Sequence, residues 1–228
     1  MKRAPGFEPY KRNFLQMPLP CGEGFSFKEV LLMAETVKAT ILNEADVQRT
    51  LVRIAHEIVE SNGGAHGLAL VGIVTRGDAL AHKLAEIIQS IENEEVPVGT
   101  LDISLYRDDI GSKLSPVLKR TEVNFPLEEK TIVLVDDVLF TGRTIRAALD
   151  ALMDLGRPRC IRLAVLVDRG HRELPIRADF VGKNVPSAYQ ENVRVRVTPF
   201  DEVNSVEILE APAPDHSPGL DPAGGERR

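Results

Sequence analysis

An apolar run leads directly into two adjacent carboxylates and a short polar loop in the segment Thr131-Ile-Val-Leu-Val-Asp136-Asp137-Val-Leu-Phe-Thr141-Gly142-Arg143-Thr144. Its first residues are β-branched or aliphatic, as expected of a parallel strand that is buried on both faces. Ligands of open α/β sheets gather beyond the carboxyl ends of such strands. The segment therefore predicts a buried strand that places Asp136 and Asp137 at the ligand-binding edge of a sheet.

The loop after these carboxylates has the composition of a phosphate site. Its backbone N–H groups can converge on a phosphate, and the helix that follows directs its positive end at the same anion. There is no Lys-Ser or Lys-Thr pair after Gly142, as a nucleoside triphosphate P-loop would have, so we predict a phosphorylated sugar as ligand. Asp136 and Asp137 can then accept hydrogen bonds from the sugar hydroxyls. A strand that merely ends in a capping aspartate explains one acid but not the pair. The predicted phosphate-binding residues are Val138, Leu139, Phe140, Thr141, Gly142, Arg143 and Thr144.

Strand and helix patterns alternate along the rest of the chain. Amphipathic helices are expected from Asn43 to about Glu60, after Thr75-Arg76-Gly77, and from Thr144 until Gly156 and Pro158 stop the helix. Strands are expected at residues 37–42, 67–74, 96–105, 131–135 and 161–167, near 180, and at 193–197. This alternation predicts an α/β fold with a mainly parallel, twisted sheet flanked by helices.

Composition supports one globular domain. The chain has 228 residues, of which 43% are hydrophobic and 27% charged, and no apolar run approaches the ~18 residues that cross a bilayer. We expect a soluble, cytoplasmic protein without a membrane partner. Cys21 and Cys160 are far apart and lack nearby thiol or histidine partners, so neither a disulfide framework nor a zinc site is indicated. The net charge of −6 argues against indiscriminate nucleic-acid binding but allows a local basic face.

The two ends of the chain differ in composition from the middle. Residues 210–228 are rich in Pro, Ala, Gly and Asp and are expected to form a disordered tail, and residues 1–32 are expected to be a disordered extension. The triplet Lys28-Glu29-Val30 can be encoded as AAG-GAG-GTN, a ribosome-binding sequence, so one hypothesis is that translation starts at Met33. The alternative is a genuine unstructured extension, and the intact mass of the native protein distinguishes the two. Residues 33–209 form the predicted domain.

Three motifs together resemble a known family. The segment from Val135 to Thr144 resembles the phosphoribosyl pyrophosphate (PRPP) motif of the type I phosphoribosyltransferases. Leu101-Asp-Ile-Ser-Leu-Tyr-Arg-Asp-Asp-Ile110 and the segment from Val167 to Asn184 are similar to the bifunctional pyrimidine operon attenuator and uracil phosphoribosyltransferase family, PyrR. The similarity covers about residues 37–209. It implies the type I phosphoribosyltransferase fold, with a small hood and a flexible lid loop over the site.

The resemblance also implies roles for single residues. Asp136, Asp137 and Arg107 would be catalytic: the carboxylates hold the ribose and stabilise developing positive charge, and Arg107 meets the leaving pyrophosphate as the lid closes. Thr75 and Arg76 follow a buried strand and would bind pyrophosphate. Mg²⁺ would enter with PRPP rather than through direct side-chain ligands. Uracil would be bound through backbone groups near two further residues, Arg169 and Val193.

In that family the protein also binds the leader of its own messenger RNA in response to uridine nucleotides. The resemblance therefore implies PRPP, uracil, UMP, UTP and the leader mRNA of a pyrimidine operon as partners, and a homodimer or larger assembly. A solvated helix face together with active-site arginines would explain the same charges without RNA. The alternative function is a phosphoribosyltransferase for uracil or a purine base without RNA regulation. The candidate RNA-binding residues are Arg53, His56, Arg172, Arg177 and Lys183.

Overall fold

A computed structural model describes residues 36–106 and 121–210. The predicted extension at residues 1–32, the predicted tail except its first residue, Glu210, and most of the predicted lid, Arg107 included, lie outside the described residues. No helix within the described ranges is long and apolar enough to cross a membrane.

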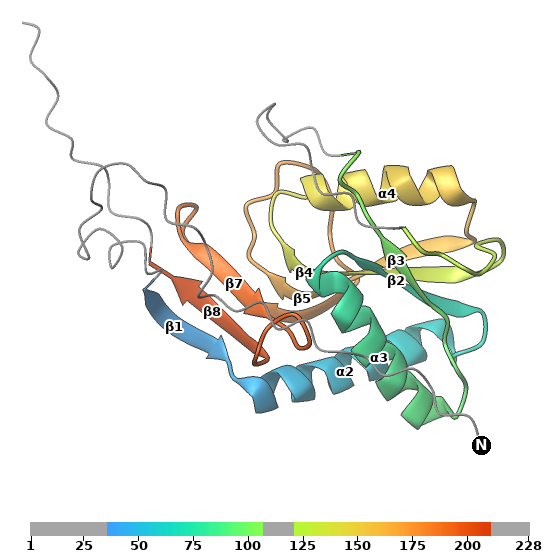
Figure 1. The fold of residues 1–228 in the computed structure, drawn as a ribbon, viewed down its shortest axis with the longest axis horizontal. Coiled ribbons are helices and arrows are strands. Elements are labelled where there is room, and N and C mark those ends of the chain that lie inside the picture. Colours follow the sequence, from blue (N-terminus) through green and yellow to red (C-terminus); the bar gives the residue numbers. More distant parts are fainter. Residues whose placement is uncertain (1–35, 107–120, 211–228) are drawn as a thin grey trace, which may run out of the picture. The chain divides into compact units, whose positions relative to one another are not determined.

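The centre of the fold is a five-stranded, fully parallel sheet with the strand order β3-β2-β4-β5-β6 (Figure 1). Strand β4 lies in the middle and is buried along most of its length, which explains its unbroken apolar run. Because all five strands point the same way, their carboxyl ends meet at one edge. The strands are β2 (Leu68–Ile73), β3 (Val98–Leu101), β4 (Thr131–Leu139), β5 (Cys160–Asp168) and β6 (Phe180–Asn184).

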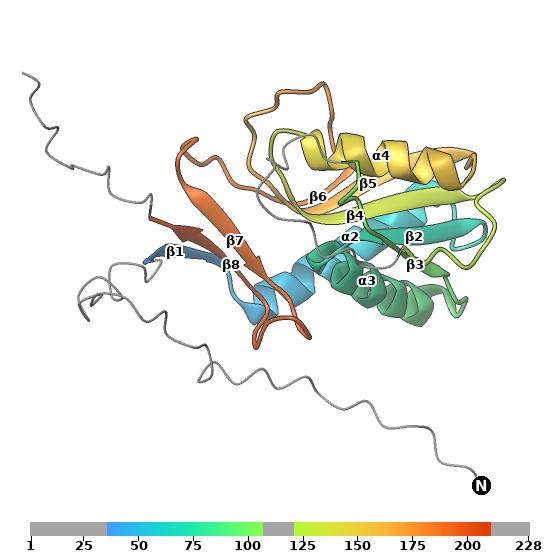
Figure 2. The same cartoon turned by 45° about the horizontal axis from the view of Figure 1, so that its top comes forward.

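Helices cover both faces of this sheet: α2 and α3 lie on one face and α4 on the other (Figures 1 and 2). Helix α2 begins with a capping box, in which Asn43 and Asp46 each accept a hydrogen bond from the other's backbone N–H. Within the described residues the helices are α2 (Glu44–Asn62), α3 (Arg76–Glu92) and α4 (Arg143–Leu155). Helix α4 ends immediately before Gly156, as the sequence predicts.

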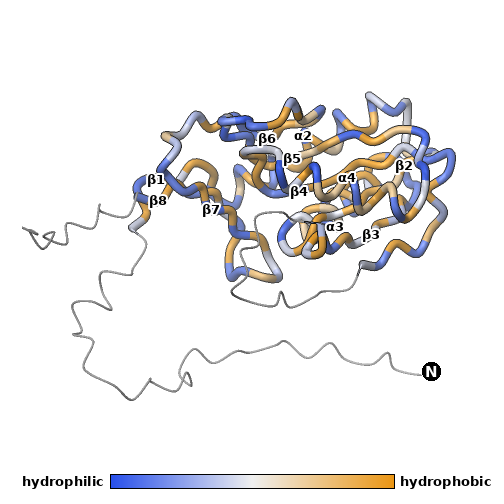
Figure 3. The backbone as a smooth tube through the Cα atoms, turned by 90° about the horizontal axis from the view of Figure 1, so that it is seen from above, coloured by the Kyte–Doolittle hydropathy of each residue, from blue (hydrophilic) through white to orange (hydrophobic). Residues whose placement is uncertain are grey.

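The alternating side chains of each strand divide the core into two clusters. Val133 and Val135 of β4 face α2 and α3, where they join residues such as Leu80. Ile132 and Leu134 face α4 in the second cluster. Figure 3 shows hydrophobic stretches along the central strands and hydrophilic residues in the connecting loops. Each fully buried side chain of this size stabilises the fold by roughly 1.5–3 kcal/mol before entropy is counted.

A second, antiparallel sheet with the strand order β1-β8-β7 corresponds to the expected hood. Its strands are β1 (Val37–Leu42), β7 (Asn192–Arg196) and β8 (Ser205–Leu209). Strand β8 was not predicted. The prediction of one strand over residues 96–105 was also wrong beyond Leu101. There the Asp102 carboxylate accepts hydrogen bonds from the Ser104 N–H (2.8 Å) and hydroxyl (2.6 Å), and this local turn ends the strand.

Candidate active site

A cleft of about 290 Å³ lies at the carboxyl ends of β2, β3 and β4. It brings together residues from two separate parts of the sequence that were predicted to act on one ligand, the pair Thr75-Arg76 and the segment from Asp136 to Thr144. It also contains Asp102, Ile103 and Ser104, which the sequence analysis did not select. The lining residues are Ile73, Val74, Thr75, Arg76, Asp102, Ile103, Ser104, Asp136, Asp137, Val138 and Thr144.

The two carboxylates at the end of β4 are held by main-chain donors. The Asp137 N–H donates to Asp136 Oδ1 (3.0 Å), and the Val138 N–H donates to Asp137 Oδ1 (2.8 Å). Burial raises the pKa of the Asp137 carboxyl, although the Val138 N–H and the Arg76 guanidinium oppose the rise. Asp136 is buried, and Asp137 is half-buried. Two fixed acceptors next to a cleft are suited to binding neighbouring hydroxyl groups.

The predicted phosphate loop lines an adjoining cavity of about 330 Å³, which is formed by residues 138–145 and Glu173. Gly142 stands before the first turn of α4 with φ of 93°, a left-handed conformation that favours glycine. A Cβ atom there would also lie 3.4 Å from side-chain atoms of Leu174 and Ile176. Gly142 has no side chain to cap α4, and the Arg143 N–H donates to Thr141 Oγ1 (3.4 Å), so the positive end of the helix lies beside the phosphate loop.

The segment after β5 fixes the back of this phosphate loop. The Thr141 carbonyl accepts hydrogen bonds from the N–H groups of Glu173 (3.0 Å) and Leu174 (3.1 Å). The Arg172 guanidinium donates to the carbonyls of Phe140 (2.8 Å) and Ile176 (2.9 Å) and pairs with the Asp168 carboxylate, so it ties the loop to the segment.

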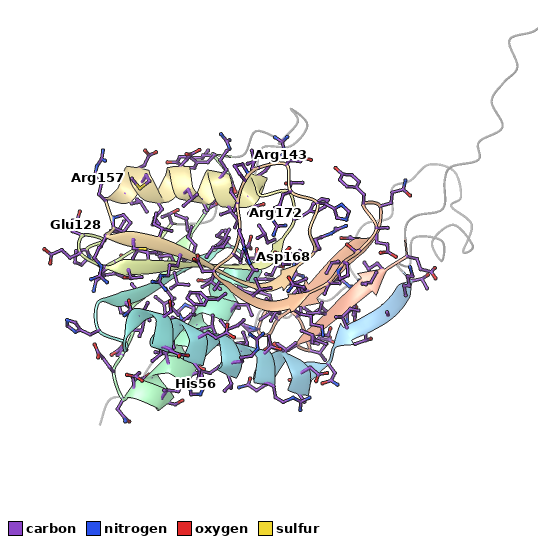
Figure 4. The ribbon with its side chains drawn as sticks, turned by 180° about the vertical axis from the view of Figure 1, so that it is seen from behind. His56, Glu128, Arg143, Arg157, Asp168 and Arg172 are labelled. Carbon is purple, nitrogen blue, oxygen red and sulfur yellow. The ribbon has the colours of Figure 1, made fainter. Side chains whose placement is uncertain are left out.

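Figure 4 places Arg172 and Asp168 near the first turn of α4, where Arg143 begins the helix. Arg143 Nε donates to the Glu173 carboxylate (2.7 Å), which adds a further link between α4 and the same segment. The phosphate loop is therefore supported by side-chain and main-chain bonds from one neighbouring stretch of chain.

Arg76 opens α3 directly after Thr75, and both border the cleft, while their predicted binding of pyrophosphate stays a prediction. The guanidinium is held by the carboxylate of Asp201: Nε donates to Oδ2 (3.0 Å) and Nη2 to Oδ1 (3.1 Å). This bidentate pair raises the pKa of Arg76, and Asp137 adds to the rise. Gly77 lets the helix approach β4, because a Cβ atom there would lie 2.4 Å from the Val135 carbonyl oxygen.

Arg169, predicted to lie near uracil, directs its side chain into the protein. Its guanidinium donates to Ser187 Oγ (3.1 Å) and to the carbonyls of Ala188 (3.2 Å) and Glu191 (2.7 Å), and it lies 4.1 Å from the centre of the Phe140 ring. Burial lowers the pKa of this guanidinium. The side chain thus holds the loop before β7 against the phosphate loop. Binding of uracil through backbone groups near Arg169 and the buried Val193 stays a prediction.

The candidate RNA-binding residues separate into two groups. Arg53 lies on α2 and donates to the carbonyls of Val181 (3.0 Å) and Gly182 (2.6 Å), so it sits beside β6, where Lys183 is exposed. His56 also lies on α2 (Figure 4). Arg177 is exposed on the segment before β6, whereas Arg172 is engaged with the phosphate loop. A common RNA surface stays a prediction.

Two residues of the site, Asp102 and Asp201, were not predicted, and only one of them had a usable signal in the sequence. Asp102 follows β3 directly, and the carboxyl end of a parallel strand was a usable signal. Asp201 is separated from Arg76 by 125 residues and belongs to a loop after β7, so no local pattern links them.

Comparison with known proteins shows to which class of protein the chain belongs. The model of the phosphoribosyl transferase domain matches residues 39–199, so the chain belongs to that family and is a phosphoribosyltransferase. The chain is 62% identical over 174 residues to the bifunctional protein PyrR of Thermus aquaticus, covering 76% of this chain and 96% of the relative. PyrR of Deinococcus deserti is 58% identical over 172 residues, covering 75% and 94%. The particular family is therefore that of the bifunctional PyrR proteins.

Solved structures agree in fold. A hypoxanthine phosphoribosyltransferase from Staphylococcus aureus superposes with a TM-score of 0.58 at 19% identity, covering 76% of this chain and 93% of that one. The enzyme from Trypanosoma cruzi in complex with the product IMP gives 0.59 at 18% identity, covering 77% and 92%. At this identity the likeness supports the shared fold alone.

Proposed function

We propose that the protein transfers phosphoribose from PRPP to uracil, giving UMP and pyrophosphate, and that it regulates a pyrimidine operon by binding leader mRNA in response to uridine nucleotides. The observation that carries the transferase part is one cleft shared by the paired carboxylates, Thr144 of the phosphate loop, and Thr75 and Arg76. Kinship with PyrR proteins at 62% identity supports both parts.

In the proposed reaction the ribose 5-phosphate group lies on the N–H groups at the start of α4, and Asp136 and Asp137 accept hydrogen bonds from the ribose hydroxyls. The C–O bond at the anomeric carbon breaks as a bond to a uracil nitrogen forms, the electron pair leaves with pyrophosphate, and that nitrogen releases its proton to the departing pyrophosphate. Charge on the sugar ring is oxocarbenium-like at this point, and the two carboxylates stabilise it. Thr75, Arg76 and Arg107 hold the departing pyrophosphate.

The residues present fit a cation that arrives with the substrate. Asp136 and Asp137 border the cleft, yet the described ranges contain no cluster of three or more His, Cys, Asp or Glu side chains able to hold a metal ion by themselves. Mg²⁺ bound with PRPP would neutralise charge on the pyrophosphate oxygens. The chain itself contributes the groups that bind the sugar, the phosphate and the pyrophosphate around one cleft.

Regulation by RNA requires phosphate contacts and access to unpaired bases. The pair of α2 and β6 offers Arg53, His56 and Lys183 on neighbouring elements, with Arg177 on the segment that precedes β6. Because the proposed ligands are cytoplasmic metabolites and messenger RNA, we propose a cytoplasmic location. We also propose a homodimer or larger assembly, as the family resemblance implies.

Two measurements test the proposed function separately. With radiolabelled bases and PRPP, we expect uracil to be converted to a nucleotide. If hypoxanthine or guanine gives a nucleotide and uracil does not, the substrate is a purine base and the proposed uracil specificity is wrong. With a leader-RNA hairpin at moderate salt, we expect UMP to increase binding in a gel-shift titration. If UMP produces no shift while uracil is turned over, the protein is a transferase without RNA regulation.

A further inference from the structure

The loop between β7 and β8 brings a carboxylate to the edge of the cleft from the hood side of the fold. Asp201 in this loop is mostly covered, with 19% of its side chain exposed, and it accepts two hydrogen bonds from Arg76 in a bidentate arrangement. Its Oδ2 atom also accepts the Val197 N–H (2.8 Å). One carboxylate therefore connects the end of β7 to the first residue of α3.

The loop that carries Asp201 is itself fastened at several points. Lys83 of α3 donates through Nζ to Thr198 Oγ1 (3.0 Å), and the Thr198 N–H donates to Asn204 Oδ1 (3.0 Å). Asn204 in turn donates through Nδ2 to Glu44 Oε1 (3.2 Å) at the start of α2. Both ends of the loop are bonded to helices, so the position of Asp201 is fixed. From this position Asp201 can hold the long side chain of Arg76 in one orientation.

Acidic and basic side chains alternate from the hood sheet to the cleft, in the order Glu207, Arg196, Asp201, Arg76 and Asp137. Arg196 on β7 lies 3.6 Å from the Glu207 carboxylate on β8 and acts electrostatically on Asp201. Burial pushes the pKa of Asp201 upward, but Arg76, the Val197 N–H and Arg196 outweigh it, and the pKa lies below its ordinary value. Asp201 is thus a stable anion next to Arg76, which also interacts with Asp137 across the cleft.

The contact leaves part of Arg76 available. A guanidinium has five N–H donors in a planar fork, and the pair with Asp201 uses donors on Nε and Nη2. The remaining donors can bind an anion, and 36% of the side chain is exposed at the cleft. A fixed plane with free donors is a better phosphate ligand than a rotating side chain, because the ordering entropy is already lost before binding.

We propose that Asp201 is a positioning residue that sets the orientation of Arg76 for pyrophosphate, so that the hood loop takes part in recognising PRPP and its leaving group. This inference rests on the proposed function, in particular on Arg76 as a pyrophosphate ligand. Asp201 does not contact the substrate in this account. It acts through Arg76.

The substitution Asp201→Asn tests the proposal with little change in shape. An amide oxygen at the Oδ2 position keeps the bonds from the Val197 N–H and from Arg76 Nε, whereas the amide nitrogen at Oδ1 cannot accept from Nη2. We expect the affinity for pyrophosphate with Mg²⁺, measured by titration calorimetry, to fall about tenfold, the size of one lost charge-assisted hydrogen bond. The KM for PRPP should rise in parallel, while UMP affinity and the KM for uracil stay unchanged.

Glu202→Gln serves as the matched control, because it removes the same charge from the exposed neighbouring position in the loop. Melting temperatures of both variants report whether the loop still folds. Should Asp201→Asn fold poorly, Asp201→Glu keeps the charge but displaces the carboxylate by one methylene, and the same selective loss of pyrophosphate affinity is expected.

Arg76→Gln and the double variant separate the possible failures. If Asp201 acts only through Arg76, the double variant binds pyrophosphate as Arg76→Gln does, and the two effects are not additive. Loss in Arg76→Gln with wild-type affinity in Asp201→Asn would overturn the positioning role. Tighter pyrophosphate binding by Asp201→Asn would overturn it too, because Asp201 would then compete with the ligand. Unchanged affinity in Arg76→Gln would instead remove Arg76 from the proposed site.

Discussion

The ionised form of Asp137, which the proposed site uses, lowers the stability of the folded protein. Burial raises the pKa of its carboxyl above the ordinary value, which means that ionisation near neutral pH destabilises the folded state. The neutral acid contributes stability below the unfolded pKa of about 3.9, and this contribution is lost as pH rises through the folded pKa. Asparagine resembles the neutral acid at every pH and still accepts the Val138 N–H.

We therefore predict that Asp137→Asn loses most of the transferase activity yet melts higher than the wild type near pH 7.5. A gain of one kcal/mol would correspond to about 2–4 °C in a protein of this size. Calorimetric scans from pH 3.5 to 8 should show the difference shrinking towards acid pH. Asp150→Asn, on the exposed face of α4, controls for removal of a negative charge. A lower melting temperature at pH 7.5 would show that the bonds of the carboxylate outweigh its burial.

Single residues were predictable where their chemistry is encoded locally. Asp136, Asp137 and Gly142 stand in one segment, because a parallel strand, a tight turn and a helix N-terminus are consecutive in the chain. The partner of Arg76 could not be predicted in this way. Asp201 reaches it only because the hood loop and α3 are brought together by the fold, and a single acid in a loop has no distinguishing sequence pattern.

At the level of elements, the segment from Asp168 to Ile176 belongs structurally to the phosphate loop. Arg172 connects the two through the carbonyls of Phe140 and Ile176, and backbone bonds to Thr141 run parallel to it. From the family resemblance, Arg172 is one of the candidate RNA-binding residues. Its contacts indicate that a loss of RNA binding on substitution can arise indirectly, through a disturbed nucleotide site.

The role of Arg172 in supporting the phosphate loop can be tested without RNA. Arg172→Ala removes the donors to Phe140 and Ile176 and leaves the Asp168 carboxylate without this partner, so the phosphate loop should lose its shape. We expect UMP affinity to fall about tenfold in calorimetry, with a KM for PRPP that rises similarly. Arg157→Ala, at the far end of α4 in Figure 4, is the control. Wild-type UMP affinity in Arg172→Ala would place the residue outside the nucleotide site.

The strands of the hood show why some elements were harder to predict than others. The central strands are continuous apolar runs, which a parallel sheet buried on both faces requires. Strand β8 has Glu207 in the middle, and the burial of this carboxylate depends on Arg194 of the neighbouring strand, 2.8 Å away. Because Glu207 interrupts the apolar residues of this short segment and is paired across to Arg194 on β7, the local sequence does not identify β8 as a strand.

At the scale of the whole molecule, a net charge of −6 has to be reconciled with the proposed binding of RNA. Long-range attraction to a polyanion is absent, so affinity must come from short-range contacts on the basic part of α2 and β6. Such contacts release counterions, and the logarithm of the affinity should fall linearly with that of the salt concentration. Each lost phosphate contact reduces the slope by about 0.7 for single-stranded RNA.

Lys183→Gln should therefore weaken leader-RNA binding in the presence of UMP and reduce the salt slope by about 0.7, without changing UMP affinity or uracil turnover. The reason is that Lys183 is exposed on β6, beside Arg53, and lines neither the cleft nor the phosphate cavity. Lys130→Gln, before the start of β4 and hence at the opposite edge of the sheet, removes the same charge from the molecule and should leave the slope unchanged. Filter-binding titrations at four salt concentrations measure both. Equal slopes for the two variants would mean that β6 lies outside the RNA surface, and a parallel loss of UMP affinity would mean that the effect is transmitted through the nucleotide site.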